Sequence, residues 1–270
     1  MKDDIKIIAE IGWNFLGDMS LANKMISDAK KSGADVAKFQ FWSPLTLKAG
    51  SWDTDGRREI YNKAALSIEK IENIKSMCRN EGIESLFSVF TLNEAEILKS
   101  LNENTIKIPS HEIANEELIK YASMNFNYVY LSTGASTKKE TERSSEILKN
   151  GNAGYNLMHC VSSYPCSNDK SNLPRINWLK TLHSEVGLSD HSQSTISPSL
   201  AVSLGATVIE KHFTSDNDLE GRDNKFALNP DAFSKMVLFV REAEELLVDR
   251  GLNFQDSEKD TIENYRGRWG

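Results

Sequence analysis

Short apolar runs alternate with amphipathic stretches along the whole chain. Eight runs have the length and composition of buried strands, and they span residues 5–11, 34–41, 82–90, 104–109, 127–133, 155–161, 185–190 and 206–213. After each run, apolar residues recur at the three-to-four spacing of a helix with one buried face. These helical stretches span residues 21–31, 67–80, 92–101, 115–124, 138–149, 173–182, 196–204 and 230–247.

Eight strand–helix units in 270 residues predict an α/β fold, the (β/α)8 TIM barrel. We expect the barrel to occupy residues 1–249 and a polar tail to occupy residues 250–270. An open doubly wound sheet is the alternative. It is disfavoured because the turn after the first strand, "GWNFLGD", lacks the GxGxxG fingerprint of dinucleotide-binding sheets.

Charge and composition exclude several classes of partner. The net charge of −7 and the absence of basic runs argue against a nucleic-acid partner held by a basic surface. No apolar run approaches the roughly 18 residues of a membrane span, so we expect no membrane partner. The N-terminal stretch "MKDDIKIIAEIG" lacks the apolar segment of a signal peptide, which predicts a cytoplasmic protein.

Polar residues crowd the carboxyl ends of the predicted strands. In a (β/α)8 barrel the catalytic groups lie at those ends, whereas a buried strand interior is apolar because unpaired buried polar groups are costly. The polar strand-end residues are Glu10, Lys38, Gln40, Ser88, Lys107, Ser110, Glu112, Ser132, Thr133, Ser162, Tyr164, Asp190, His191, Glu210 and His212. We interpret this pattern as a functional site.

Two of the strand ends present a histidine. His191 follows "GLSD" and His212 follows "VIEK" on the next strand, and neutral imidazole is a common ligand of divalent metals. The alternative is that each ring is only hydrogen-bonded near a strand end. With Glu10 and Glu112 available in the same barrel mouth, the two interpretations carry equal weight on residue patterns alone.

Two lysines, Lys38 and Lys107, face the interior in the same layer of the predicted barrel. Buried ammonium groups need an anionic partner. One interpretation is a phosphorylated, carboxylated substrate, bound by both lysines and by nearby serine hydroxyls. The other is a pair of internal salt bridges to Glu10 and Glu112.

Strand alternation assigns several other residues to structural roles. Lys211 points away from Glu210 and His212, so we expect it to be structural. His159 has the opposite parity from the strand-end serines. Cys160 has no histidine that the sequence places beside it, and we expect it to be a bystander, like Cys166.

The segments that carry these residues resemble, in order, the sialic acid synthase (N-acetylneuraminate synthase) family. The matching stretches are "IAEIGWNFLGD", "GADVAKFQ", "IKIPSHEIAN", "LSTGAST", "LMHCVSSYP", "GLSDHS", "LGATVIEKHFTSD" and "EGRDNKFALNPD". The resemblance implies an enzyme that condenses phosphoenolpyruvate with a hexosamine-type sugar aldehyde to give a nonulosonic acid and phosphate. It also implies a divalent metal cofactor, Mn²⁺ or Mg²⁺, and a homodimer is plausible.

The resemblance assigns a role to individual residues. It implies that His191 and His212 bind the metal, that Glu10 and Glu112 are catalytic, and that Asp190 supports His191. It implies phosphoenolpyruvate contacts from Lys38, Ser88, Lys107, Ser110, Ser132 and Ser162. It implies acceptor-sugar contacts from Gln40, Tyr164 and Asp223.

The chain departs from the family pattern in three places. Residues 14–18 read "NFLGD" where members often read "NHNGD", and Ser162 stands where an asparagine is common. We also expect no C-terminal antifreeze-like domain, which in typical members contributes an arginine to the partner's acceptor site. Our hypothesis is that Arg266 or Arg268 takes that place over a barrel mouth. The alternative is that Tyr265 and Trp269 pack the tail against the barrel exterior.

Two other functions share the same barrel. A Schiff-base pyruvate aldolase would use Lys38 or Lys107 as a nucleophile without a metal. A non-catalytic sugar-phosphate binding or regulatory homologue would need the lysines but not the paired histidines beside two carboxylates.

Overall fold

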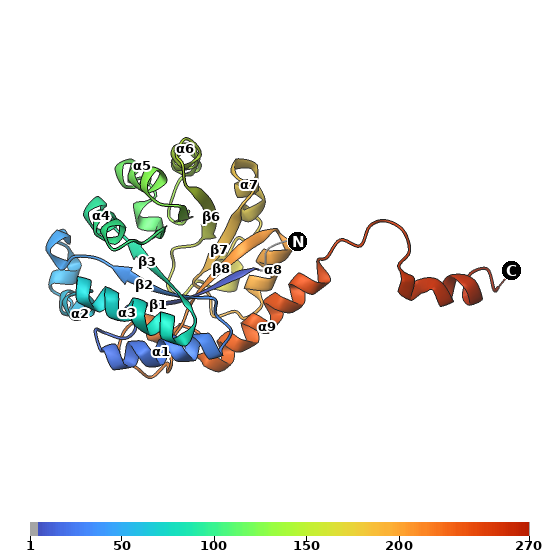
Figure 1. The fold of residues 1–270 in the computed structure, drawn as a ribbon, viewed down its shortest axis with the longest axis horizontal. Coiled ribbons are helices and arrows are strands. Elements are labelled where there is room, and N and C mark those ends of the chain that lie inside the picture. The colour runs from blue at the N-terminus through green and yellow to red at the C-terminus, as the bar shows by residue number, and fades with distance from the viewer. Residues whose placement is uncertain (1–4, 270) are drawn as a thin grey trace.

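The computed structural model describes residues 5–269 and contains a closed barrel of parallel strands (Figure 1). The strands are β1 Lys6–Gly12, β2 Val36–Phe41, β3 Glu84–Val89, β4 Thr105–Ile108, β5 Tyr128–Ser132, β6 Gly154–Cys160, β7 Val186–Asp190 and β8 Ala206–His212. They are hydrogen-bonded in chain order, and β1 pairs with β8 to close the barrel. The predicted (β/α)8 TIM barrel is confirmed.

Helices cover the outside of the barrel. They are α1 Met19–Lys31, α2 Arg57–Ala64, α3 Ile68–Glu81, α4 Leu92–Ser100, α5 Glu116–Asn125, α6 Lys138–Lys149, α7 Arg175–Leu182, α8 Ser197–Ser203 and α9 Pro230–Leu246. Within residues 5–269, none of these helices has both the length and the apolar composition needed to cross a membrane.

Local sequence explains where several helices begin. Asp18 accepts hydrogen bonds from the first backbone N–H groups of α1, and Ser67 does the same for α3. Thr137 and Glu140 form a reciprocal capping box on α6. Gly82 ends α3 in the left-handed conformation, which is energetically unfavourable for a residue with a Cβ. Each cap starts or stops a helix next to a barrel strand and so fixes the length of its loop.

The barrel interior is divided into layers by strand alternation. Its floor is a separate apolar cluster made of Ile8, Val36, Leu86, Tyr130, Met158 and Val208. Two residues further along the same strands, the inward side chains become polar: Glu10, Lys38, Ser88, Ser132, Cys160 and Glu210. The floor therefore seals one end of the barrel, and the polar residues lie above it towards the carboxyl ends of the strands.

Residues after α9 leave the barrel. The tail runs away from the body of the molecule and ends in a short helix, Thr261–Tyr265 (Figure 1). Tyr265 and Trp269 are 53% and 89% exposed, so the predicted packing of these rings against the barrel exterior is wrong. The predicted ranges 1–249 and 250–270 include residues 1–4 and 270, which lie outside the described residues.

Candidate active site

Four buried charges form the centre of the barrel mouth. Lys38 Nζ lies 2.7 Å from Glu10 Oε2 and 3.6 Å from Glu210 Oε2, and Lys107 Nζ lies 2.7 Å from Glu210 Oε2. All four side chains are almost completely buried. Because each ammonium faces a carboxylate, the cluster is electrically balanced and can remain ionised away from water.

The two carboxylates are held by further hydrogen bonds. Gln40 Nε2 donates to Glu10 Oε1 at 2.6 Å, and Ser189 Oγ donates to Glu210 Oε1 at 2.9 Å. Burial alone would raise the pKa of Glu210, but the ammonium groups of Lys107 and Lys38 outweigh it and lower this pKa to about 2. Glu210 is therefore a fixed anion at any physiological pH.

The two lysines differ in their electrostatic surroundings. Burial and the charge of Lys38 lower the pKa of Lys107, although the carboxylate of Glu210 opposes this shift. Burial alone would also lower the pKa of Lys38, but the carboxylates of Glu10 and Glu210 outweigh burial and raise this pKa. Lys38 additionally donates to Ser88 Oγ at 2.8 Å. Predicted donor-binding residues from β2, β3 and β4 thus meet in one place.

Serine hydroxyls line the mouth next to this cluster. The backbone N–H of Gly134 donates to Ser110 Oγ at 3.0 Å. A Cβ at Gly134 would lie only 2.5 Å from Ser162 Oγ and 2.8 Å from Ser110 Oγ, so glycine is what allows the two hydroxyls to approach the backbone. Ser132 Oγ is buried without a hydrogen-bond partner in the described chain. Such an unsatisfied hydroxyl is suited to a bound oxyanion.

The two strand-end histidines face each other. The ring centroids of His191 and His212 are 5.3 Å apart, and Tyr164 lies against His191 with a centroid distance of 4.1 Å. His191 Nδ1 is 2.8 Å from the carbonyl oxygen of Val161, which can only accept, so Nδ1 carries the proton and Nε2 has a free lone pair. This is the tautomer that a backbone carbonyl selects in a metal-binding histidine.

His212 fits a metal ligand by a different observation. Its Nδ1 is buried and has no hydrogen-bond partner within residues 5–269, and Asp223 Oδ2 is 3.8 Å away. Burial, with the charges of His191 and Lys38, holds the pKa of His212 well below its usual range, which keeps the ring neutral. In the described residues, no group of three or more His, Cys, Asp or Glu side chains is placed to hold an ion.

One side of the mouth contains Asp223 and an aromatic cluster. Trp13 Nε1 donates to Asp223 Oδ2 at 2.8 Å. The ring of Trp13 lies 5.6 Å from Tyr61 of α2 and 6.5 Å from Trp42, and Trp42 lies 6.2 Å from Phe90. These partly exposed rings come from the ends of β1, β2 and β3 and from the long loop after β2. That loop folds back so that Tyr61 borders the site.

Comparison with protein families gives a match to the NeuB family over residues 25–251. The chain belongs to the NeuB family. A pseudaminic acid synthase of Campylobacter jejuni is 38% identical over 263 residues, covering 93% of this chain and 77% of the relative. An N,N'-diacetyllegionaminic acid synthase of Legionella pneumophila is 33% identical, covering 89% of this chain and 72% of the relative.

A solved structure supports the same assignment for this NeuB-family chain. The N-acetylneuraminic acid (sialic acid) synthetase from Leptospira borgpetersenii, crystallised with citrate, matches it with a TM-score of 0.86 and 31% identity. The match covers 97% of this chain and 91% of that chain. The family predicted from the sequence motifs is therefore confirmed, together with its barrel.

Two residues of the NeuB-family chain have other partners than those considered from the sequence. Glu112, which one interpretation paired with a buried lysine, lies half-buried at the same edge of the barrel. Its carboxylate accepts from Asn115 Nδ2 at 2.8 Å, and within residues 5–269 it forms no salt bridge to a lysine. The partner of Lys107 is Glu210 instead. Asp190, expected to support His191, lies on the opposite face of β7 from that ring and pairs with Lys211, whose predicted structural role fits this position. Any support that Asp190 gives to His191 therefore acts through the backbone and not through a contact with the ring.

Cys160 does have a histidine beside it. Its Sγ is 3.8 Å from His191 Nδ1, so the expectation that no histidine is placed near this thiol is wrong. The sequence did not reveal the contact because β6 and β7 become neighbours only when the barrel forms. His159 is buried on the other side of β6, where Nε2 contacts the carbonyl oxygen of Ser171 at 2.7 Å, in agreement with its predicted structural role.

Two arginines are not brought to the mouth of their own barrel. Arg266 and Arg268 are exposed on the projecting tail, and the guanidinium of Arg268 lies over the rings of Tyr265 and Trp269. Two residues that sequence reasoning left without a role belong to the site: Glu210 and Ser189. Glu210 shares its inward parity with His212, and Ser189 shares its parity with His191. This parity is the signal that could have identified both residues.

Proposed function

We propose that this protein condenses phosphoenolpyruvate with a hexosamine-type sugar aldehyde to form a nonulosonic acid, with consumption of water and release of inorganic phosphate. The observation that carries the proposal is the buried Lys38–Glu210–Lys107 cluster, bordered by serine hydroxyls and by the His191–His212 pair. The names of the relatives, synthases of pseudaminic and N,N'-diacetyllegionaminic acid, support this reaction class.

The donor would bind in the deeper part of the mouth. The ammonium groups of Lys38 and Lys107 supply fixed positive charge for its phosphate and carboxylate. Hydroxyls orient those groups, and the residues that supply them are Ser88, Ser110, Ser132 and Ser162, with Ser189 added by the structure. Since Glu10 and Glu210 already balance the lysines, they also limit how tightly the anion is held and so favour release of phosphate.

The histidine pair would hold a divalent ion, Mn²⁺ or Mg²⁺. When bound, such an ion acts as a Lewis acid that polarises the acceptor's carbonyl group. The fit rests on the unbonded Nδ1 of His212 and on the tautomer that Val161 imposes on His191. Tyr164, Gln40 and Asp223 border the same space and would orient the sugar.

The reaction balances in these terms. The methylene carbon of phosphoenolpyruvate forms a bond to the aldehyde carbon, and the aldehyde oxygen takes up a proton to become a hydroxyl. Water adds to the resulting oxocarbenium-like carbon and loses a proton. Phosphate then leaves with cleavage of its bond to that carbon and takes the proton of the new hydroxyl, which becomes the keto group of the product. Glu10, held by Gln40, would act in proton transfer at the hydroxyl of the acceptor. Glu112, held by Asn115, would take the proton of the water.

Phosphate release from phosphoenolpyruvate across a panel of acceptors tests the proposal. The panel contains N-acetylmannosamine, its 6-phosphate, mannose and di-acetamido hexoses, each with Mn²⁺, Mg²⁺ or EDTA. We expect release that requires one acceptor and a metal, and a product whose mass equals that of the corresponding nonulosonic acid. Lys107→Met should abolish turnover, whereas Lys149→Met, at an exposed lysine of α6, should leave it unchanged.

Two results would contradict the proposal. A covalent adduct trapped on Lys107 or Lys38 by borohydride would identify a Schiff-base enzyme. The ion pair of Lys107 with Glu210 argues against this outcome, because it stabilises the charged ammonium even though burial lowers the lysine pKa. Folded protein that binds phosphoenolpyruvate but turns over no acceptor in the panel would instead indicate a binding or regulatory homologue.

A further inference from the structure

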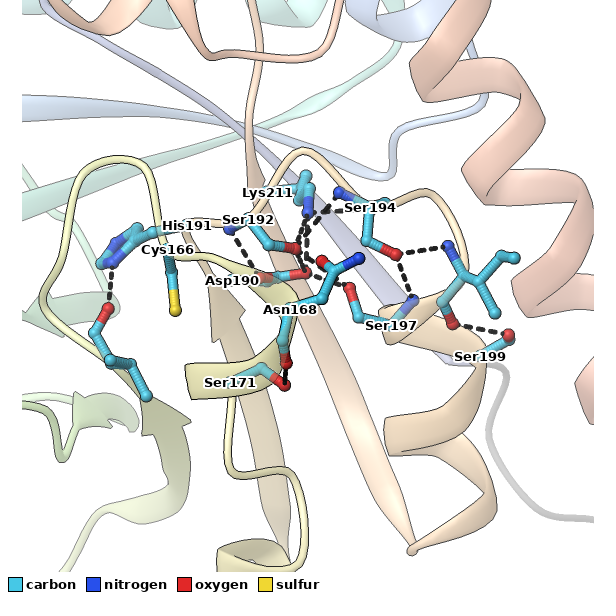
Figure 2. Close-up of polar contacts among 12 residues, drawn as sticks. Cys166, Asn168, Ser171, Asp190, His191, Ser192, Ser194, Ser197, Ser199 and Lys211 are labelled. Carbon is cyan, nitrogen blue, oxygen red and sulfur yellow. Dashed lines mark hydrogen bonds and ion pairs between the residues drawn. The ribbon is translucent and has the colours of Figure 1, made fainter.

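A buried ion pair lies behind the two strand-end histidines. Lys211 Nζ is 2.6 Å from Asp190 Oδ2, and the two residues are 1% and 6% exposed (Figure 2). The pair sits between the barrel wall and α8, on the outer face of β7 and β8. Outer barrel positions normally pack apolar side chains against the helices, so a charged pair here requires an explanation.

Each member of this pair immediately precedes a histidine of the candidate site. Asp190 is followed by His191 and Lys211 by His212, and the strand register pairs Asp190 directly with Lys211. Because successive side chains of a strand point to opposite faces, the ion pair and the histidines lie on opposite sides of the same two strand ends. The ion pair therefore links β7 to β8 at the level from which both rings project.

The network also fixes the backbone that follows His191. Lys211 Nζ uses its remaining donors on Ser192 Oγ at 3.1 Å and on the carbonyl oxygen of Ser194 at 3.0 Å. Asp190 Oδ1 accepts from the backbone N–H of Ser192 at 2.8 Å, and Ser197 Oγ of α8 donates to Asp190 Oδ2 (Figure 2). His191 is thus held on both sides, by Asp190 before it and Ser192 after it.

The energetic value of such a pair argues for a positional role. Removing two charges from water costs about as much as their attraction returns, and apolar replacements of buried pairs are often neutral or stabilising. A fully satisfied polar network does, however, specify one geometry, because any other arrangement leaves a buried charge unpaired. Here the geometry specified is the relative position of two neighbouring strand ends.

We propose that Asp190 and Lys211 are positioning residues that set the separation and orientation of His191 and His212. This inference rests on the proposed function, since it concerns the histidine pair assigned there to a divalent ion. Residues that support metal ligands in this way change metal affinity by about 10- to 100-fold when removed, even though they do not touch the ion.

The test is the double variant Asp190→Asn/Lys211→Met, which removes both charges and leaves neither one unpaired. We expect an unchanged melting temperature but Mn²⁺ affinity weakened by about 10- to 100-fold, measured from the EPR signal of free Mn²⁺. The visible absorption spectrum of bound Co²⁺ should also change, because it depends on ligand geometry. The matched control is Lys75→Met/Glu103→Gln, which removes a half-buried ion pair with an N–O distance of 3.0 Å. This pair lies away from the site, so the control should leave both readouts unchanged.

Each outcome decides the inference. A folded double variant with wild-type Mn²⁺ affinity and Co²⁺ spectrum overturns it. If the double variant does not fold, Ser197→Ala, which removes one hydrogen bond to Asp190, becomes the deciding variant, and unchanged affinity and spectrum again overturn the inference. Wild-type protein that binds no Mn²⁺ contradicts the metal assignment of the proposed function itself, which is a separate failure.

Discussion

Asp223 shows how burial tunes one side chain of the site. Burial, helped by the nearby charge of Glu10, raises the pKa of this carboxyl to about 6, although the hydrogen bond from the Trp13 indole N–H lowers it. A carboxyl with a pKa near neutrality can exchange a proton at physiological pH. Under the proposed function, Asp223 could therefore carry a proton as well as accept a hydrogen bond from the sugar.

The variant Asp223→Asn should reveal this shift as a pH-dependent stability difference in metal-free protein. The folded-state pKa of about 6 lies above the ordinary pKa of an aspartate side chain, 3.8. The wild-type carboxyl is therefore neutral in both states below about pH 4, and becomes a buried charge as pH rises through 6. We expect no stability difference below pH 4 and a gain for the variant of roughly 3 kcal/mol at pH 8.

Urea unfolding in EDTA at pH 4, 6 and 8 measures this difference. Asparagine retains an oxygen that can accept from Trp13, so the hydrogen bond seen at 2.8 Å serves as an internal control. A stability difference of the same size at every pH would show that packing, and not charge, is responsible.

At the level of single residues, sequence reasoning worked where strand parity decided and failed where a partner had to be chosen. Parity placed Glu10, Lys38 and Lys107 inside the barrel. It could not show that Lys107 pairs with Glu210 and not Glu112, because three strands lie between the two residues along the chain and only barrel closure brings them together. The partner of Asp190 was missed for a related reason: its side chain and that of its sequence neighbour His191 point to opposite faces, so Asp190 pairs with Lys211 on the outer face.

At the level of elements, the loop after β5 shapes the serine side of the site. Gly134 lets this loop run against Ser110, Ser162 and Cys160, and a Cβ would come within 2.9 Å of all three side chains. The stretch "LSTGAST" thus carries a packing requirement as well as a family motif. Its glycine is needed for space, not for an unusual backbone angle.

The variant Gly134→Ala should therefore impair donor binding more than it impairs folding. We expect a stability loss of about 1–3 kcal/mol from overpacking, together with a fall in kcat/KM for phosphoenolpyruvate of about 10²-fold, because the hydroxyls must shift. The control is Gly154→Ala at the opposite end of β6, where a Cβ would meet the Tyr128 ring at 2.9 Å. An equal effect of both variants on kcat/KM would contradict this prediction.

The succession of elements was predictable because each strand–helix unit carries its own periodicity and its own caps. The exception is α2, Arg57–Ala64, which none of the predicted helical stretches covers. Its sequence, "RREIYNKA", is polar with one buried residue, so it lacks the apolar stripe that reveals a helix. Its position comes instead from tertiary contacts, among them the packing of Tyr61 on Trp13 and Trp42.

At the scale of the whole molecule, the barrel and the tail are energetically separate. Leu252 and Trp269 are fully or almost fully exposed, and the tail projects away from the helices (Figure 1). Removing residues 250–270 should leave the free energy of unfolding unchanged within about 0.5 kcal/mol, as for changes at exposed positions. A fall in melting temperature of several degrees would show that the tail packs on the barrel after all.

Arg266 and Arg268 lie on this tail, and their role in acceptor binding can be tested separately. Since neither reaches the mouth of its own barrel, a role in acceptor binding requires that the tail meet a second copy of the chain. In that case the variants Arg266→Ala and Arg268→Ala raise the acceptor KM at an unchanged melting temperature. Wild-type KM and kcat in both variants would remove these arginines from the acceptor site.

The apolar floor of the barrel has a kinetic consequence. Ile8, Val36, Met158 and their neighbours fill the lower end with buried side chains, so the polar layers of the described barrel face the mouth. Lys38 and Glu210 lie one side-chain layer above that floor, whereas Gln40 and His212 lie two layers above it. Under the proposed function, a sugar seated at the upper layer would obstruct the route to the lower one. Turnover would then be sequential: the phosphorylated donor would enter before the sugar, and the deepest-bound product would leave last.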